Sequence, residues 1–205
     1  MTKLKLTYFD SPTSRGEECR LALFIAGADF EDHRIQRSDW PALKPTTPFG
    51  CLPTLELEGK PVVSQSNAIL GHIGRHHGLL PKDEWEALRL ESLMCAVEDL
   101  RHAITKTFGI HEPEELKRQR EDLVAGPIRT WAANTERQIQ GPFAGGKQIS
   151  VADIKIFIVA GWLKRGVLDH VPTNVLSGFP KLEELCRSVE NHPKVVEWYS
   201  RPIDP

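Results

Sequence analysis

The stretch that decides the fold is residues 49–69, which read FGCLPTLELEGKPVVSQSNAI. After Pro53, apolar and polar residues alternate over 54–58, which predicts a short strand. A Gly-Lys turn then brings the chain back into a second strand at 61–64, and a helix is expected from the following Gln-Ser pair to about residue 77. A strand hairpin that leads directly into a helix indicates a mixed sheet of the α/β classes.

Two features of this stretch suggest a binding site. Leu52 precedes a proline, at a point where its backbone is free of sheet partners and available to a peptide. Ser66 lies where the helix begins, so free N–H groups and the positive end of the helix dipole point outward at an anion. A peptide-like ligand that carries a carboxylate would satisfy both features.

The segment before this stretch predicts the remainder of an α/β domain. Residues 4–8 alternate as a strand with Leu4, Leu6 and Tyr8 on one face, and a helix follows over about 16–25. A weaker strand at 30–35 and a short helix at 39–44 complete the order β-α-β-(short α)-β-β-α. The first crossover is expected to be right-handed. We predict that this domain spans residues 1–78.

The pattern changes after Pro81, because no further strand is predicted. Apolar residues recur at helical spacing over about 85–104, and a second long helix is expected over about 113–140 with a kink at Pro127. The segment from Ser150 to Leu163 is apolar nearly all round, and Ser150 and Asp153 are placed to form a capping box at its start. Two more helices are predicted at 180–190 and 193–200, which gives an all-helical domain over residues 84–205.

Composition excludes several classes of partner. The net charge is -2, so no general attraction to nucleic acid or an anionic membrane is expected. No apolar run reaches the length of a membrane span. The four cysteines are scattered without a CxxC pair, which argues against a zinc site and a disulfide framework and favours a reducing cytoplasm. His72 and His76 share a helix face but lack a third ligand, so no metal is expected.

The predicted order resembles that of the cytosolic glutathione transferases, which join a thioredoxin-like domain to a helical domain. The sequence Gly50-Cys51-Leu52-Pro53, followed by Gln65-Ser66, resembles the glutathione site of that family, and Ser150 to Asp153 resembles its capping box. Within the family, the chain is most similar to the sigma class or a related bacterial tyrosine type, through Tyr8-Phe9, Arg15, Trp40 and Lys44.

The resemblance implies that glutathione is the co-substrate and that each of its groups has a partner on this chain. Leu52, freed by a cis Pro53, would pair with the cysteinyl unit, and Gln65 and Ser66 would hold the γ-glutamyl end. The glycine carboxylate would be bound by Trp40 and Lys44. Asp99 would reach the ammonium of a glutathione in the partner subunit, which requires a homodimer.

The glutathione thiol must be activated, because the thiolate is the nucleophile. Tyr8 ends the first strand, where its hydroxyl could donate to the sulfur, and Arg15 could add positive charge and help to hold the tyrosine. Ser11 is the alternative and Ser14 a weaker one, because residues 11–14 resemble a thioredoxin C-P-x-C turn with both cysteines replaced by serine.

Three functions remain open on these residues. The first is conjugation of glutathione to small hydrophobic electrophiles, and the second is a glutathione-dependent isomerase or peroxidase on the same site. The third is a non-catalytic ligand-binding protein that keeps the fold without the chemistry. Proximity along the sequence and the family resemblance together suggest five side chains as walls of the electrophile pocket: Phe9, Ser11, Arg101, Thr105 and Phe108.

Overall fold

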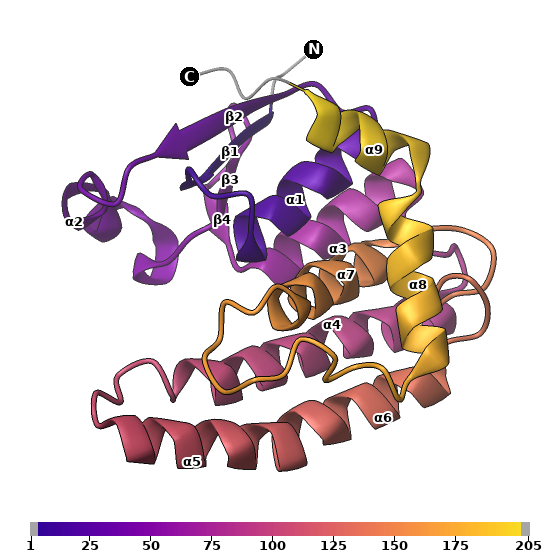
Figure 1. The fold of residues 1–205 in the computed structure, drawn as a ribbon. Helices are drawn as coiled ribbons and strands as arrows, with labels where there is room; N and C mark the ends of the chain where they lie inside the picture. The colour runs from indigo at the N-terminus through magenta and orange to yellow at the C-terminus, as the bar shows by residue number, and fades with distance from the viewer. Residues whose placement is uncertain (1–3, 202–205) are drawn as a thin grey trace.

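A computed structural model describes residues 4–201 of the chain (Figure 1). The N-terminal part is thioredoxin-like, with a four-stranded mixed sheet in the order β2-β1-β3-β4. The strands β1 and β2 are parallel, and the other two pairs are antiparallel. The elements of this part are β1 (Leu4–Phe9), α1 (Ser14–Ile25), β2 (Phe30–Ile35), α2 (Trp40–Leu43), β3 (Thr54–Glu56), β4 (Val63–Ser64) and α3 (Ser66–His77).

The central strand β1 is covered on both faces. Leu6, Thr7 and Tyr8 are all buried, although they alternate between the two sides of the sheet. The helices α1 and α3 pack against each other beside the sheet, and α7 (Val151–Lys164) packs against both. Figure 1 shows α1 and α3 between the sheet and the helical domain. The interface between the two parts of the chain is therefore centred on α1, α3 and α7, and α4 and α9 also contribute to it.

Within the described residues, the helices of the C-terminal part are joined by loops, one of which holds a single β-bridge between Phe143 and Gly146. Besides α7, this part contains α4 (Glu84–Thr105), α5 (Pro113–Leu123), a π-helical turn η3 (Val124–Ile128), α6 (Arg129–Gln138), α8 (Pro180–Glu190) and α9 (Pro193–Ser200). Where a kink is predicted at Pro127, the two α-helices are separated by this π-helical turn, because a proline cannot donate the helical hydrogen bond. The last helix, α9, returns to the N-terminal part, where Trp198 Nε1 donates to Glu17 Oε1 at 2.7 Å.

The helix α7 lies at the centre of the helical part, as its apolar sequence predicts. Ser150 Oγ accepts a hydrogen bond from the Asp153 N–H, and the Asp153 carboxylate accepts one from the Ser150 N–H at 2.8 Å. The predicted capping box is therefore confirmed. One residue contradicts the apolar character of this helix, because Lys155 is fully buried in its first half.

The predicted fold class is confirmed, and the differences are local. The strand predicted over 54–58 ends at Glu56, and its partner is only Val63–Ser64. Two 3-10 turns, at Lys44–Thr46 and Pro48–Gly50, precede β3 and were not predicted. The division between residues 78 and 84 stays a prediction. Between residues 4 and 201, no helix is both long and apolar enough to cross a membrane. The same residues contain no group of three or more His, Cys, Asp or Glu side chains arranged to hold a metal ion.

Candidate functional site

A cavity of about 340 Å³ lies between the thioredoxin-like part and the helical part. The N-terminal side of its wall comes from β1, the loop that follows it, the start of α1 and Arg37 after β2. The opposite side comes from α4, the turn after it, and α7. All five side chains that were expected beside the electrophile line this cavity, in a wall formed by Tyr8, Phe9, Ser11, Thr13, Ser14, Arg15, Arg37, Arg101, Thr105, Phe108, Ile158 and Trp162.

Tyr8 is fixed at this wall by its neighbours. It is 9% exposed, and its ring packs edge-on against Phe9 with centroids 5.5 Å apart. The guanidinium of Arg20 lies 5.8 Å from the centre of the Tyr8 ring. Gly16, in the first turn of α1, lies directly behind the ring, since a methyl group built there would overlap Cδ1 and Cγ of Tyr8. The ring therefore depends on the absence of a side chain at residue 16.

Arg20 stabilises the loop over residues 10–14, which carries the two candidate serines. This arginine is fully buried and donates to the carbonyl oxygens of Phe9 and Ser11 at 3.0 and 2.9 Å. The Ser11 hydroxyl lies 2.8 Å from the Thr13 hydroxyl, with which it shares a hydrogen bond. Ser14 has a positive φ of 65° and begins α1. Both Tyr8 and Ser11 face the cavity, so the choice between them stays a prediction.

The peptide-binding features predicted around Pro53 and Ser66 lie together at the start of α3. The Leu52–Pro53 bond is cis, and within residues 4–201 the Leu52 backbone makes no hydrogen bond. Gln65 has a φ of 77°, and its Nε2 donates to Cys51 Sγ at 3.7 Å, so its side chain lies beside the Cys51–Pro53 turn. Ser66 is buried as the first residue of α3, and no side chain caps that helix. The first N–H groups of α3 therefore remain available to an anion.

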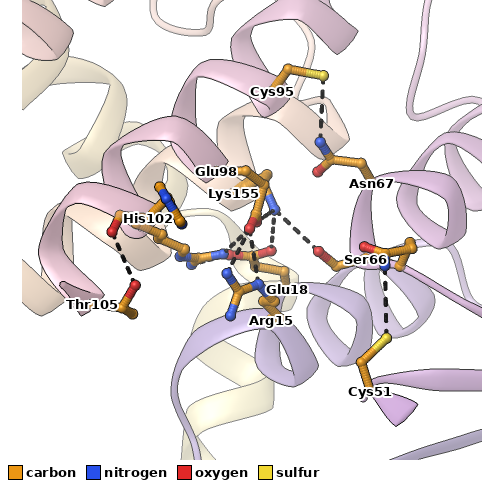
Figure 2. A network of polar contacts seen from close by, with 12 residues as sticks. Arg15, Glu18, Cys51, Ser66, Asn67, Cys95, Glu98, His102, Thr105 and Lys155 are labelled. Atoms are coloured by element: carbon orange, nitrogen blue, oxygen red, sulfur yellow. Dashed lines mark hydrogen bonds and ion pairs between the residues drawn. The ribbon is translucent and has the colours of Figure 1, made fainter. Parts of the chain in front are cut away.

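A network of charged side chains connects this helix start to the cavity (Figure 2). Arg15 donates to Glu98 Oε2 from Nε and Nη2 at 2.9 and 2.7 Å. Lys155 Nζ contacts Glu98 at 2.6 Å, Glu18 at 2.9 Å and the Ser66 hydroxyl at 3.3 Å. Arg101 pairs with both Glu18 and Glu98. The network therefore joins Arg15 and Arg101 at the cavity to Ser66 at the start of α3.

The positive charges of this network keep the Glu98 carboxyl ionised. Burial alone would raise the pKa of the Glu98 carboxyl, but the charge of Lys155, with Arg101 and Arg15, lowers that pKa to about 2. Glu98 is thus an anion at neutral pH and orients Arg15 through two hydrogen bonds. In the described residues, Arg15 makes no hydrogen bond to Tyr8, so its predicted effect on the tyrosine rests on their shared place in the cavity wall.

Sequence reasoning missed the inner members of this network: Glu18, Glu98 and Lys155. The signal for one of them was available, since a lysine within the apolar run of α7 must be paired if it is buried. The identity of its partners was not available, because Glu18 lies 137 residues away in the sequence.

The remaining predicted site residues lie farther from the network. Trp40 packs edge-on against Phe9 with centroids 5.9 Å apart, whereas Lys44 is exposed with its side chain beside Gly50. Asp99 is exposed on α4 and lines a different cavity of about 650 Å³ between α4 and the η3–α6 segment. Within one chain, the structure therefore does not bring Asp99 to the other candidate residues.

Comparisons with known proteins agree with this geometry. Residues 4–75 match the model described as the glutathione S-transferase N-terminal domain, and residues 98–202 match that of the C-terminal domain. Glutathione S-transferase 1 of Ascaris suum is 34% identical over the full length of both chains. A glutathione S-transferase of Anopheles gambiae is 30% identical over 99% of this chain and 98% of its own.

Solved structures show the same likeness. Prostaglandin synthase D of Nilaparvata lugens superposes with a TM-score of 0.85 at 29% identity, over 98% of this chain and 100% of its own. The glutathione S-transferase of Ascaris lumbricoides gives a TM-score of 0.82 at 30% identity, over 99% of both chains. With the family's two domains matched in order and full-length relatives at this identity, the chain belongs to the glutathione S-transferase family and is a glutathione transferase with glutathione as its co-substrate.

Proposed function

We propose that this glutathione transferase conjugates the glutathione thiolate to small hydrophobic electrophiles. The observation that carries the proposal is the 340 Å³ cavity, because its wall combines aromatic rings with the Tyr8 hydroxyl and is joined to the start of α3 by the charge network. An apolar electrophile is stabilised by Phe9, Phe108 and Trp162, and the sulfur lies beside Tyr8.

In this proposal, glutathione is held along its whole length. The Leu52 backbone pairs with the cysteinyl unit, and Gln65, Ser66 and the N–H groups of α3 hold the γ-glutamyl carboxylate. Trp40 and Lys44 are assigned to the glycine carboxylate, as a ring N–H donor and a mobile positive charge. Within residues 4–201, the unpaired Leu52 backbone supports the assignment of the cysteinyl unit, and the uncapped start of α3 supports that of the γ-glutamyl carboxylate.

Thiol activation by itself supplies only part of the rate. A free thiol of pKa about 8.5 is roughly 3% ionised at pH 7, and lowering that pKa by about 2 units gives a roughly 25-fold gain in thiolate. The lower basicity reduces nucleophilicity about 8-fold for a Brønsted slope of about 0.45. Since the net gain is only a few-fold, most of the acceleration must come from holding the electrophile beside the sulfur.

The test is glutathione binding by calorimetry together with turnover of an aryl halide. Gln65→Ala and Ser66→Ala should each weaken binding, because loss of a hydrogen bond to a charged group costs about 1.5–3 kcal/mol. Ser177→Ala, at an exposed serine of the helical part, is the matched control and should bind as the wild type does. Unchanged affinity in both site variants would remove the proposed site, and binding without turnover would contradict conjugation.

A glutathione-dependent isomerase is the second candidate. It is supported by the likeness to the prostaglandin synthase D of Nilaparvata lugens and by 38% identity over 99 residues to a hematopoietic prostaglandin D synthase of Gallus gallus, about half of each chain. Conjugation consumes one glutathione per product, whereas isomerisation returns it. The ratio of glutathione consumed to product formed therefore separates the two functions.

We also propose that the chain works as a two-fold dimer of the sigma-like or a related tyrosine type in a reducing cytoplasm. The exposed Asp99 supports the dimer, since it borders a cavity whose wall includes the apolar side chains of Leu93, Ala96 and Trp131. The strand-end Tyr8 supports the tyrosine type. The four cysteines, all within the described residues, are free, which is consistent with a reducing compartment.

A further inference from the structure

Lys155 is the most unusual residue of the helical part. It is fully buried in α7, where nine of its helix neighbours are buried as well: Val151, Ala152, Asp153, Ile154, Ile156, Ile158, Val159, Ala160 and Leu163. A buried ammonium is costly unless each of its N–H groups is paired. The residue therefore needs a reason beyond packing, for which an apolar side chain of similar volume would serve at least as well.

The ammonium of Lys155 has three donors and meets three acceptors, each on a different helix. These are Glu18 Oε2 on α1 at 2.9 Å, Glu98 Oε1 on α4 at 2.6 Å and Ser66 Oγ on α3 at 3.3 Å (Figure 2). Two of these acceptors are carboxylates, which Lys155 shares with Arg15 and Arg101. The third donor is directed at the residue with which α3 begins.

The contact fixes the direction of the Ser66 hydroxyl. An ammonium has no lone pair and can only donate, so Ser66 Oγ is the acceptor. The hydroxyl proton of Ser66 must then be given to another group. Between residues 4 and 201, Ser66 Oγ has no hydrogen-bond partner besides Lys155, and Ser66 is only 4% exposed. The Ser66 hydroxyl is therefore free to donate its proton to an acceptor on a ligand that binds at the start of α3.

The charge of the cluster favours an anion at the same place. Arg15, Arg101 and Lys155 supply three positive charges, whereas Glu18 and Glu98 supply two negative ones. One positive charge is thus left without a carboxylate within the cluster. A ligand carboxylate bound at Ser66 would restore the balance in a region where burial strengthens the attraction.

We propose that Lys155 is a positioning residue for glutathione, which acts through Ser66 by leaving its hydroxyl proton for the γ-glutamyl carboxylate. The inference rests on the proposed function. It assigns to the central helix of the C-terminal domain a direct part in binding at the N-terminal domain. Lys155 contacts Ser66 and is not expected to contact the ligand. A change at Lys155 should therefore weaken glutathione binding only while the Ser66 hydroxyl is present.

The test is a double-mutant cycle on the full-length chain. One arm is Lys155→Met with Glu18→Gln, which removes one positive and one negative charge and leaves the excess of the cluster unchanged. This arm should weaken the glutathione Kd about tenfold, the loss expected for one charge-assisted hydrogen bond. The other arm is Ser66→Ala. In the Ser66→Ala background, the Lys155 change should weaken the Kd less than about twofold further, because the hydroxyl that it orients is gone.

Kinetics separate positioning from a general loss of structure. The KM for glutathione should rise about tenfold in the Lys155 arm, whereas the KM for the electrophile and kcat at saturating glutathione should stay within about twofold. Lys164→Met, the same substitution at an exposed position of α7, is the control and should change none of these values. If the paired variant does not fold by circular dichroism, Lys155→Leu with Glu18→Gln, which also removes the donor to Ser66 and keeps the charge excess unchanged, takes its place in the cycle.

The possible failures are distinguishable. If the wild type does not bind glutathione, the proposed function fails and the inference fails with it. If the wild type binds and Ser66→Ala weakens binding while the Lys155 arm binds as the wild type does, only the inference is overturned. Full additivity of the two arms would also overturn it, because independent effects mean that Lys155 does not act through Ser66.

Discussion

Two hydroxyl groups at the cavity wall compete for the glutathione sulfur, and they differ in how free they are. The phenol of Tyr8 is held by Phe9 and Gly16, whereas the Ser11 hydroxyl already shares a hydrogen bond with Thr13 at 2.8 Å. We therefore expect Tyr8→Phe to raise the pKa of the bound thiol and to lower turnover near pH 7 at least by the few-fold gain that the thiolate supplies. Ser11→Ala should change both much less. The ultraviolet absorbance of the thiolate, titrated against pH in both variants, measures this difference.

The control for this comparison is glutathione affinity, which should stay nearly unchanged in Tyr8→Phe because only the developing thiolate loses its donor. A raised thiol pKa in Ser11→Ala, with none in Tyr8→Phe, would reverse the assignment and place the protein among the serine-type transferases.

At the level of elements, α7 depends on the capping box at its start. The Asp153 carboxylate accepts from the Ala144 N–H at 2.7 Å and from the Ser150 N–H and hydroxyl at 2.8 and 2.6 Å, all of them buried. Ser150→Ala should lower the free energy of unfolding by about 1 kcal/mol, the usual cost of a lost N-cap. Asp153→Ala should cost about 2–4 kcal/mol, because it leaves two buried backbone N–H groups unpaired.

Urea unfolding followed by circular dichroism measures both losses. Ser177→Ala, at an exposed serine beyond α7, is the control and should change the free energy of unfolding by less than about 0.5 kcal/mol. Equal losses in Ser150→Ala and Asp153→Ala would contradict the view that the carboxylate also fixes the loop at Ala144.

At the scale of the whole molecule, the position of Asp99 predicts assembly. Asp99 is remote from the site within one chain but exposed on α4, so it acts on glutathione only if a second chain presents it. Light scattering should give about twice the 23.1 kDa chain mass at micromolar concentration. Asp99→Ala should weaken glutathione binding while the dimer persists. A fully active monomer under these conditions would refute both the dimer and the role of Asp99.

Local sequence patterns predicted the helices and strands well, because hydrophobic periodicity and helix capping depend on residues that are close together in the sequence. The hairpin before α3, the capping box of α7 and the break at Pro127 all follow from such short-range signals. The five cavity-wall residues follow from proximity along the sequence together with the family resemblance. The Lys155 network could not be predicted, because its partners come from α1, α3 and α4 and meet only once the two domains are packed together. The 3-10 turns before β3 were missed because single turns leave no periodic pattern.

The close approach of Gly16 to the Tyr8 ring has a consequence for the tolerance of this chain to random change. If Tyr8 activates the thiol, then activity should tolerate substitutions at residue 16 as poorly as substitutions at residue 8, although Gly16 has no side chain that could take part in the reaction. In a library that varies both positions and is selected for survival against a toxic electrophile, alanine at residue 16 should be depleted about as strongly as phenylalanine at residue 8. A selection for folding alone, such as resistance to proteolysis, should deplete the phenylalanine far less. The difference between the two selections would identify the catalytic hydroxyl without any purified protein.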